Sequence, residues 1–407
     1  MPIRLRNGLV RYPRVAALAA LVMVALGGTA LRAQALFEKT DLFVGGQDDY
    51  NTFRGPTLLC TKKGTVLAFA EGKHDGAVDG AGSDLVLKRS LGNDRKWTPP
   101  YLSPKGEGRT RRNTMMWLPQ QVVIGSTHGE AYMNMVALID QSDGTIYVLM
   151  NPYFPPYQDV PADIWLLKST DEGATWSKPV DVTPGTGRKR LSPGVGIQLK
   201  SGRLMVAAYD DVIFSDDHGK TWKSGGTTGV EQSESQIVEL ADGSIMFNRR
   251  GQPSRTVVIS NDKGLTWTDA RLDPNLPDSD CQGTLIRYTR QDEGYSKNRL
   301  LFANPVSGAI AAGSVESDPR GRFNMTVRLS YDEGQTWPVA KEILEGPGAY
   351  SSMTVLPDGS IAIAFETGEI YGSYADHYGK LVFARFNVEW LTDGRDHLEK
   401  SDSAINR

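Results

Sequence analysis

The chain lacks the common short sequence motifs by which many catalytic residues are recognised. The five histidines are spread along the sequence, and none lies in an HExxH pattern or at another metal-ligand spacing. No GxSxG segment is present to hold a serine nucleophile, and no P-loop is present to hold a phosphate. These absences argue against metallohydrolase, serine-hydrolase and nucleotide-binding chemistry.

The overall charge of the 407 residues is −3, which gives no electrostatic reason to expect a nucleic acid or an anionic membrane as a partner. Attraction for an anionic ligand must therefore come from a local cluster of Arg or Lys. The short basic segments "RTRRN" and "RKR" are interpreted as solvated loop surface.

A different pattern, Ser-x-Asp-x-Gly-x-Thr-Trp, occurs four times. The copies begin at Ser169, Ser215, Ser260 and Ser330, so successive starts are 46, 45 and 70 residues apart, and residues 90–97 form a degraded copy. Asp and Thr can bond backbone groups in a tight turn, Gly permits a left-handed conformation, and Trp packs between sheets. We interpret this box as a structural turn rather than as a ligand site repeated on each unit.

Turn-then-strand segments recur out of phase with the boxes. Each couples a Gly or Asn turn to a short β-rich strand, which is typical of a hairpin. Long helical periodicity is absent after the N-terminal segment, so the sequence predicts an all-β, six-bladed β-propeller. The six segments are "KKGTVLAFA", "SDGTIYVLM", "KSGRLMVAA", "ADGSIMFNR", "KNRLLFANP" and "PDGSIAIAF".

The N-terminus has the three-part layout of a secretory signal peptide. Four Arg precede a long apolar run, which ends in an Ala33-x-Ala35 cleavage pattern. We expect residues 1–35 to be removed on export, leaving a periplasmic or secreted propeller over residues 36–400 with no stable membrane insertion. The alternative is an uncleaved membrane anchor. In an exported protein Cys60 and Cys281 could pair, and the sequence leaves this open.

The boxes and the propeller together resemble the sialidase (neuraminidase) family, and the resemblance extends from about Tyr50 to Asn387. It implies an exo-α-sialidase that removes terminal α-linked sialic acids from glycoproteins, glycolipids and oligosaccharides by a retaining mechanism, without a metal or another cofactor. The same resemblance leaves two other activities open. One is transfer of the sugar, or hydrolysis of a different nonulosonic acid; the other is binding of acidic glycans without catalysis.

Three arginines match the family's carboxylate-binding residues. They are Arg54 in "YNTFRGPTLL", Arg250 in "GSIMFNRRG", where the register favours it over Arg249, and Arg322 in "RGRFNMTVRLS". Planar guanidinium groups bind carboxylates with two parallel hydrogen bonds, and a sialic acid carries a carboxylate on its anomeric carbon. The resemblance therefore implies a three-arginine clamp.

Tyr350 in "GAYSSMTVL" matches the family's nucleophile, and Glu234 in "EQSESQIVEL" matches the base that takes its proton, with Glu231 as a nearby rival. A carboxylate nucleophile would be repelled by the substrate's own carboxylate, and sialidases use Tyr instead. A phenol has a pKa near 10, so it needs a base beside it to react at neutral pH.

The general acid is expected on the glycine-rich loop "EGKHDGAVDGAGSD". Asp79 in the middle of the loop matches it best, Asp75 is the reserve, and Asp84 opens a strand and is interpreted as structural. The resemblance also implies that Glu366, at the end of "IAIAFE", orients Arg54 through an ion pair. A buried Glu without a cation would be costly, so a cationic partner is expected on physical grounds too.

Two positions depart from the family. Gly55 replaces an Ile after the first arginine, and Lys73 stands where many sialidases have an Arg that touches the C4 side of the sugar. Lys offers one ammonium instead of a fork, so we expect Lys73 to bind substrate differently there. The aromatic segment "NPYFPPY" could wall the pocket or pack as a loop.

Overall fold

The computed structural model describes residues 34–91, 115–155, 162–230, 233–306, 321–368 and 378–399. The chain divides into Met1–Ala33 and Gln34–Arg407, and the second unit is described below. The expected signal peptide, most of the degraded box and Glu231 lie outside the described residues, so export remains a prediction. Within the described ranges, no helix is long and apolar enough to cross a membrane.

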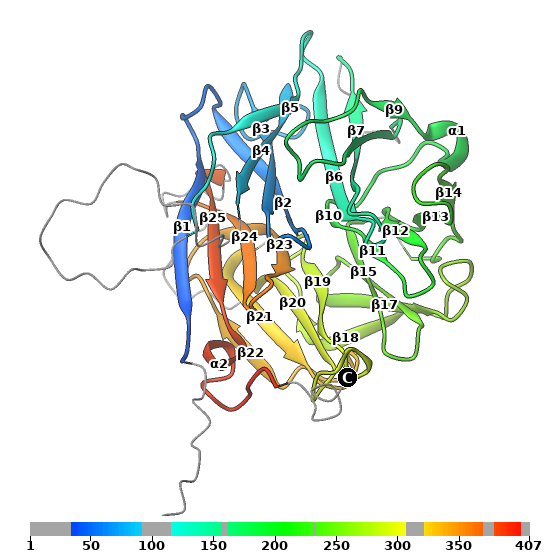
Figure 1. Ribbon diagram of the computed structural model, residues 1–407, viewed down its shortest axis with the longest axis vertical. Coiled ribbons are helices and arrows are strands. Elements are labelled where there is room, and N and C mark those ends of the chain that lie inside the picture. The colour runs from blue at the N-terminus through cyan, green and yellow to red at the C-terminus, as the bar shows by residue number, and fades with distance from the viewer. Residues whose placement is uncertain are drawn as a thin grey trace, which may run out of the picture. The chain divides into compact units, whose positions relative to one another are not determined.

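The described residues form six four-stranded antiparallel units, the blades of a propeller (Figure 1). The six-bladed fold predicted from the sequence is thus confirmed. The first blade consists of β2 (Thr52–Cys60), β3 (Val66–Lys73), β4 (Ser83–Ser90) and β5 (Gln121–Ile124), and the second of β6 (Ala131–Ile139), β7 (Ile146–Tyr153), β8 (Trp165–Ser169) and β9 (Val180–Asp181). The third blade consists of β11 (Ile197–Gln198), β12 (Leu204–Ala207), β13 (Val212–Ser215) and β14 (Lys223–Ser224), and the fourth of β15 (Ser235–Glu239), β16 (Ile245–Arg249), β17 (Ser254–Ser260) and β18 (Arg271–Pro277). The fifth blade consists of β19 (Thr284–Thr289), β20 (Arg299–Val306), β21 (Phe323–Ser330) and β22 (Val339–Glu342), and the sixth of β23 (Gly348–Val355), β24 (Ile361–Thr367), β25 (Lys380–Phe386) and β1 (Phe37–Val44).

The six turn-then-strand segments of the sequence become the second strand of each blade. The first two blades are joined into one sheet by a parallel bridge between Ser83 and Ala131. Short elements fill the connections: β10 (Gly194–Val195) pairs with β6, and α1 (Thr183–Thr186), a 3-10 turn (Gln291–Glu293) and α2 (Val388–Leu391) lie outside the sheets.

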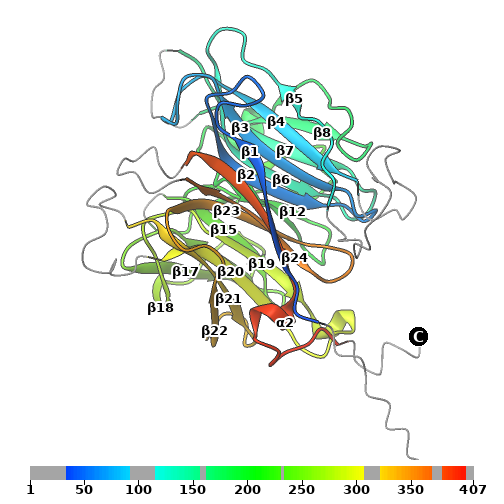
Figure 2. The same ribbon diagram turned by 90° about the vertical axis from the view of Figure 1, so that its left-hand side faces the viewer.

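The first strands of successive blades form a closed ring. β2 contacts β6, β6 contacts β11, β11 contacts β15, β15 contacts β19, β19 contacts β23, and β23 contacts β2. The ring is closed by the chain's two ends, because β1 from the N-terminal side pairs with β25 in the last blade (Figure 2). Closure leaves the outer strand of each blade as its free edge, and these edges include β1 and β18.

The core lies between the blades. Six apolar clusters of described residues each combine strands from two neighbouring blades. β3 shows why its sequence is almost continuously apolar: Val66, Ala68 and Ala70 face one neighbour, whereas Leu67 and Phe69 face the other.

The repeated box closes the turn after the third strand of four blades. In the first copy the Asp171 carboxylate accepts hydrogen bonds from Ser169 Oγ (2.8 Å), Thr175 N (2.9 Å) and Thr175 Oγ1 (2.6 Å), and Gly173 is left-handed with φ 74°. The box tryptophans pack in the inter-blade clusters. The structural interpretation of the box is confirmed.

Candidate active site

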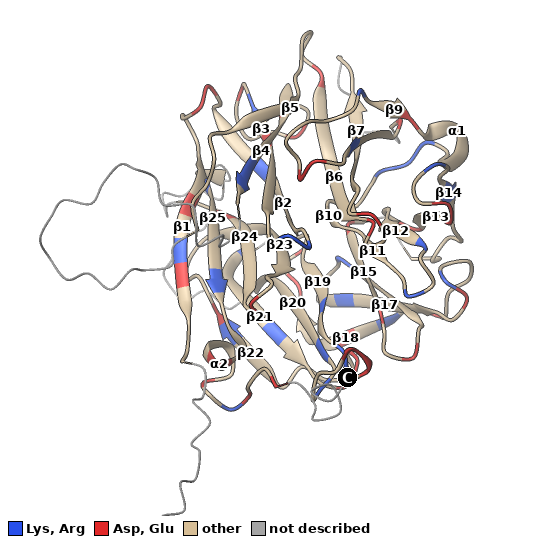
Figure 3. Cartoon of the chain, viewed as in Figure 1, with Lys and Arg blue, Asp and Glu red and all other residues tan. Residues whose placement is uncertain are grey.

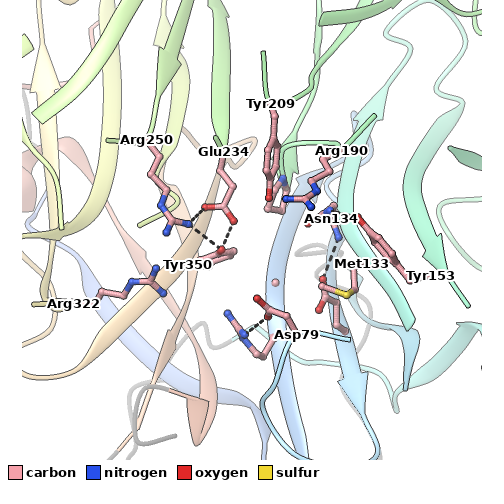
Figure 4. A pocket seen from close by; sticks show the side chains of 14 residues that line it. Asp79, Met133, Asn134, Tyr153, Arg190, Tyr209, Glu234, Arg250, Arg322 and Tyr350 are labelled. Atoms are coloured by element: carbon pink, nitrogen blue, oxygen red, sulfur yellow. Dashed lines mark hydrogen bonds and ion pairs between the residues drawn. The ribbon is translucent and has the colours of Figure 1, made fainter. Parts of the chain in front are cut away.

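One polar cavity of about 180 Å³ collects side chains from all six blades (Figure 4). Arginines, acids and tyrosines dominate its wall. Lys, Arg, Asp and Glu are mixed along the described propeller (Figure 3). Four arginines and three acids meet in the wall of the cavity. The lining residues are Arg54, Gly55, Glu71, Asp79, Met133, Asn134, Tyr153, Arg190, Pro193, Tyr209, Glu234, Arg250, Arg322 and Tyr350.

Irregularities in the innermost strands aim these side chains. The β2–β3 register shifts between Arg54 and Thr57, where Gly55 is left-handed with φ 58°, and the β23–β24 register shifts between Gly348 and Ser351. Such bulges bend a strand and redirect its side chains, and they are frequent beside active sites. Here they bring Arg54 and Tyr350 onto the cavity wall.

Tyr350 and Glu234 form the central pair. The Tyr350 hydroxyl donates a hydrogen bond to Glu234 Oε1, and Arg250 Nη1 binds Glu234 Oε2 and lies 3.4 Å from the Tyr350 oxygen. Burial, and then the negative charge of Glu234, raise the pKa of Tyr350 well above its ordinary value, although three arginines oppose this. The phenol is therefore neutral at rest and holds its proton against the glutamate.

Glu366 contacts both Arg54 and the backbone of Tyr350. Its fully buried carboxylate accepts from Gly55 N (2.9 Å), from Tyr350 N (3.0 Å) and from Arg54 Nε (3.4 Å). A buried carboxylate with one cation and two amide donors is compensated, and it fixes both neighbours. The expected Glu366–Arg54 ion pair is present in the structure.

Arg322 and Arg250 both contact Asp280. Arg322 Nη2 donates to the Asp280 carbonyl (2.7 Å) and Nη1 to Tyr378 Oη (3.3 Å), and Arg250 Nε binds the Asp280 carboxylate (2.8 Å). Arg54 lies over the Tyr378 ring at 4.0 Å. The structure thus gathers the three predicted arginines around Tyr350.

Of the acids on the glycine-rich loop, Asp79 reaches the cavity. Its carboxylate binds Arg54 Nη1 at 2.7 Å, and its side chain is 61% exposed. Asp75 is exposed and does not line the cavity. Asp84 accepts from Tyr50 Oη (2.5 Å) and Ser126 N (2.7 Å), as suits its structural interpretation.

Lys73 is not on the cavity wall. Its ammonium is fully buried, 3.5 Å from Glu71 Oε2, and it is Glu71 that lines the cavity. Burial raises the pKa of Glu71, while the charges of Lys73 and Arg54 oppose the shift. Any influence of Lys73 on a bound sugar therefore passes through Glu71.

Several wall residues were missed by the sequence reasoning. Arg190 belongs to the segment "RKR", and its interpretation as solvated surface was wrong: it lines the cavity with its guanidinium 5.6 Å from the Tyr209 ring. Tyr153 places the start of "NPYFPPY" in the wall, whereas residues 156–157 lie outside the described part. Glu71 could have been recognised from the sequence as a candidate site residue, because it is an acid in an otherwise apolar strand.

The cysteines do not pair, since Cys60 and Cys281 are both free. Burial raises the pKa of the Cys281 thiol to about 12. A thiol that stays protonated is a poor nucleophile, so Cys281 adds packing rather than chemistry beside the site.

The arrangement can bind an anion and carry out a nucleophilic displacement. Three converging guanidinium groups suit a carboxylate, and a phenol with a hydrogen-bonded glutamate is a nucleophile with its base. Asp79, which contacts Arg54, is an acid open to solvent.

Residues 64–363 match the BNR repeat-like domain family. Among curated proteins, the chain is 31% identical over 395 residues to a "Sialidase" of Micromonospora viridifaciens, covering 88% of the chain and 55% of that protein. It is 28% identical to a "Sialidase" of Bacteroides fragilis (79% and 61%) and 28% identical to an "Exo-alpha-sialidase" of Aspergillus fumigatus (85% and 86%). The chain thus spans little more than half the length of the two bacterial relatives.

Solved structures show the same fold. The "Hadza microbial sialidase Hz136" superposes with a TM-score of 0.69 at 23% identity, covering 87% of this chain and 69% of that one. An intramolecular trans-sialidase from Ruminococcus gnavus superposes with a TM-score of 0.66 at 18% identity, covering 87% and 98%.

Proposed function

The chain belongs to the sialidase family with BNR repeats, and from that premise we propose that it is an exo-α-sialidase acting on terminal sialic acids by retention. One observation supports the proposal above all: a tyrosine hydroxyl bonded to a buried glutamate stands among three arginines. The proposed substrates are sialylated glycoconjugates, and we propose that the enzyme meets them after export.

Binding starts with the carboxylate of the sugar. Arg54, Arg250 and Arg322 are positioned by protein acceptors before substrate arrives. The contact between Arg54 Nη1 and Asp79 opens when the substrate carboxylate binds, which frees both groups for their roles. The clamp presents the anomeric carbon to Tyr350 and stabilises the charge distribution of an oxocarbenium-like transition state.

In the first step the Tyr350 oxygen attacks the anomeric carbon while Glu234 takes the phenol proton. Because the Tyr350 hydroxyl is hydrogen-bonded to Glu234, the glutamate can take the proton as the bond to the anomeric carbon forms. Asp79 donates a proton to the leaving oxygen, and the aglycone departs as an alcohol.

In the second step a water molecule attacks the glycosyl-tyrosine. Asp79, now ionised, takes a proton from the water, the bond to Tyr350 breaks, and the phenolate recovers its proton from Glu234. Two inversions give net retention at the anomeric carbon.

The test is release of 4-methylumbelliferone from its α-sialoside by the chain from Gln34, beside Tyr350→Phe, each with and without EDTA. We expect turnover that survives EDTA and falls at least about 10³-fold in the variant, since nucleophile loss removes the covalent route. A folded wild-type protein without turnover would contradict the proposal, and glycan binding without turnover would favour a lectin.

A further inference from the structure

Arg255 and Asp278 form a buried ion pair that the proposed mechanism does not use. Arg255 lies in β17, Asp278 directly follows β18, and Arg255 Nη1 lies 2.8 Å from Asp278 Oδ2. Both side chains are fully buried, and neither lines the cavity. Taking two charges out of water costs several kcal/mol per ion, and apolar replacements of such pairs are often equally stable. Fold stability alone is therefore a weak reason for two charges at this place, and their other contacts indicate a further task.

The pair encloses a short segment between β18 and β19. Asp278 Oδ1 accepts a hydrogen bond from Cys281 N (3.1 Å), and Arg255 Nη1 donates to the Cys281 carbonyl (2.9 Å). Asp280 lies between these anchored residues and has a left-handed backbone with φ 53°. Such a conformation is uncommon for a residue with a side chain and persists only where the surrounding structure holds it. The ion pair is part of the structure that holds it here.

Asp280 in turn contacts two arginines of the clamp. Arg250 directly follows β16 and Arg322 directly precedes β21, so they come from neighbouring blades, and both reach the cavity (Figure 4). The Asp280 carboxylate binds Arg250 Nε (2.8 Å), and the Asp280 carbonyl accepts from Arg322 Nη2 (2.7 Å). One residue therefore sets the position of two guanidinium groups relative to each other.

The same pair also binds the backbone beside the second clamp arginine. Asp278 Oδ2 accepts from Gly251 N (3.0 Å), so the chain directly after Arg250 is bound by this carboxylate. Arg255 Nε donates to the side-chain oxygen of Asn248 in β16 (2.7 Å), and Arg255 Nη2 donates to the carbonyl of the same residue (3.2 Å). The buried pair thus connects β16, which leads into Arg250, to the segment that contacts this arginine.

We propose that Arg255 and Asp278 are positioning residues for the carboxylate clamp. They hold Asp280 in the conformation that aligns Arg250 and Arg322 with a substrate carboxylate. The inference rests on the proposed function, because that function assigns the clamp. A carboxylate accepts paired bonds from aligned guanidinium groups, whereas a neutral carboxamide offers one acceptor oxygen and no charge. The pair therefore governs the preference for a carboxylate over a neutral group rather than the binding of the sugar as a whole.

The test compares two ligands that differ at the carboxylate alone. They are 2,3-dehydro-2-deoxy-N-acetylneuraminic acid and its 1-carboxamide, and calorimetry gives the affinity of each. We expect wild type to prefer the acid at least about 100-fold, since the amide loses charge-assisted hydrogen bonds. Asp278→Asn leaves the Arg255 guanidinium without its counter-ion, so it should lower this preference at least about tenfold and change the affinity for the amide less than about threefold.

A second variant covers misfolding of the first. Arg255→Lys keeps a cation opposite Asp278 but lacks the fork that also binds Cys281 and Asn248, so it should lower the preference at least about threefold. In an Arg322→Lys background the same change should have a smaller effect than in wild type, because both changes act on one clamp. A role confined to fold stability would give independent effects.

A second buried pair supplies matched controls. Arg299 Nε binds Asp396 Oδ2 at 2.8 Å, both residues are buried, and neither lines the cavity. Arg299→Lys and Asp396→Asn should lower the thermal midpoint and keep the wild-type preference for the acid. A preference that the Arg255 and Asp278 variants keep, or that the controls lose equally, would overturn the inference. A wild type that binds acid and amide equally would instead contradict the proposed function.

Discussion

At the scale of single residues, the site combines charged groups whose burial would each be costly alone and whose cost is lowered by contacts with one another. Glu234 is compensated by Arg250 and by the Tyr350 hydroxyl, and Glu366 by Arg54 and two backbone amides. Removing one member leaves its partner buried and unsatisfied. The members of each group therefore depend on one another.

Arg322→Lys tests the clamp without changing its charge. Lysine lacks the forked guanidinium group that binds the Asp280 carbonyl and the Tyr378 hydroxyl. We therefore expect transition-state stabilisation to fall by about 1.5–3 kcal/mol, which lowers kcat/KM for an α-sialoside roughly 10- to 150-fold. Steady-state kinetics measure this. Arg203→Lys, whose guanidinium binds Asp216 away from the cavity, is the matched control. An equal effect in both variants would show that Arg322 has no special role.

The sequence predicted the residues that stand in recognisable segments and missed those joined only in space. Tyr350, Glu234 and the three arginines were found because each lies in a distinctive stretch. Arg190 and Tyr209 were missed because they lie in two connections whose meeting depends on the blade geometry. From its place in the sequence, Lys73 was expected to contact the substrate. Because side chains alternate between the two faces of β3, Lys73 lies on the same face as Glu71, and its ammonium is buried in the protein beside that residue.

At the scale of elements, regular and irregular backbone have separate tasks. The boxes fasten outer turns, and no box residue lines the cavity. The register shifts in β2, β6 and β23 aim side chains at the centre. The turn pattern could be predicted because Asp, Gly and Thr recur at fixed spacing, whereas the shifts could not, since they arise from pairing between strands.

The box aspartates should make stability depend on acid pH. Hydrogen bonds from Thr side chains, and then from Thr backbone amides, lower the pKa of Asp171, Asp217 and Asp262 to about 2. An unfolded Asp titrates near about 3.9, so their contribution is complete above that pH and is lost as the pH falls through about 2. Chemical denaturation at several pH values should show less loss between about pH 4 and 2 when all three are changed to Asn. An unchanged slope would exclude this role.

At the scale of the whole propeller, the site exists only when the ring is closed, because its wall draws on all six blades. β1 completes the last blade by pairing with β25, Phe43 is fully buried against the first blade, and Phe37 stacks on Trp390 at 4.3 Å. The fold is thus predictable from its repeats, while the closing strand carries no repeat signal of its own.

Deleting the closing strand should therefore disturb the distant cavity. A chain that begins at Gly45 loses β1 and the burial of Phe43, which alone contributes about 3–5 kcal/mol. Against a chain that begins at Gln34, we expect a lower thermal midpoint or no cooperative unfolding, together with loss of binding of a sialic acid analogue. Calorimetric scans and ligand titration measure both. Equal midpoints and affinities would refute the importance of ring closure.

The central claim is that Tyr350 becomes covalently bonded to the sugar, and trapping tests it most directly. The chain would be incubated with a 2,3-difluorosialic acid, whose fluorines slow hydrolysis of the intermediate, and its intact mass and peptides measured. The account predicts one added sugar per chain, located on Tyr350, and none in Tyr350→Phe. A sugar located on Glu234 or another residue, or turnover of an α-sialoside without any adduct, would contradict it.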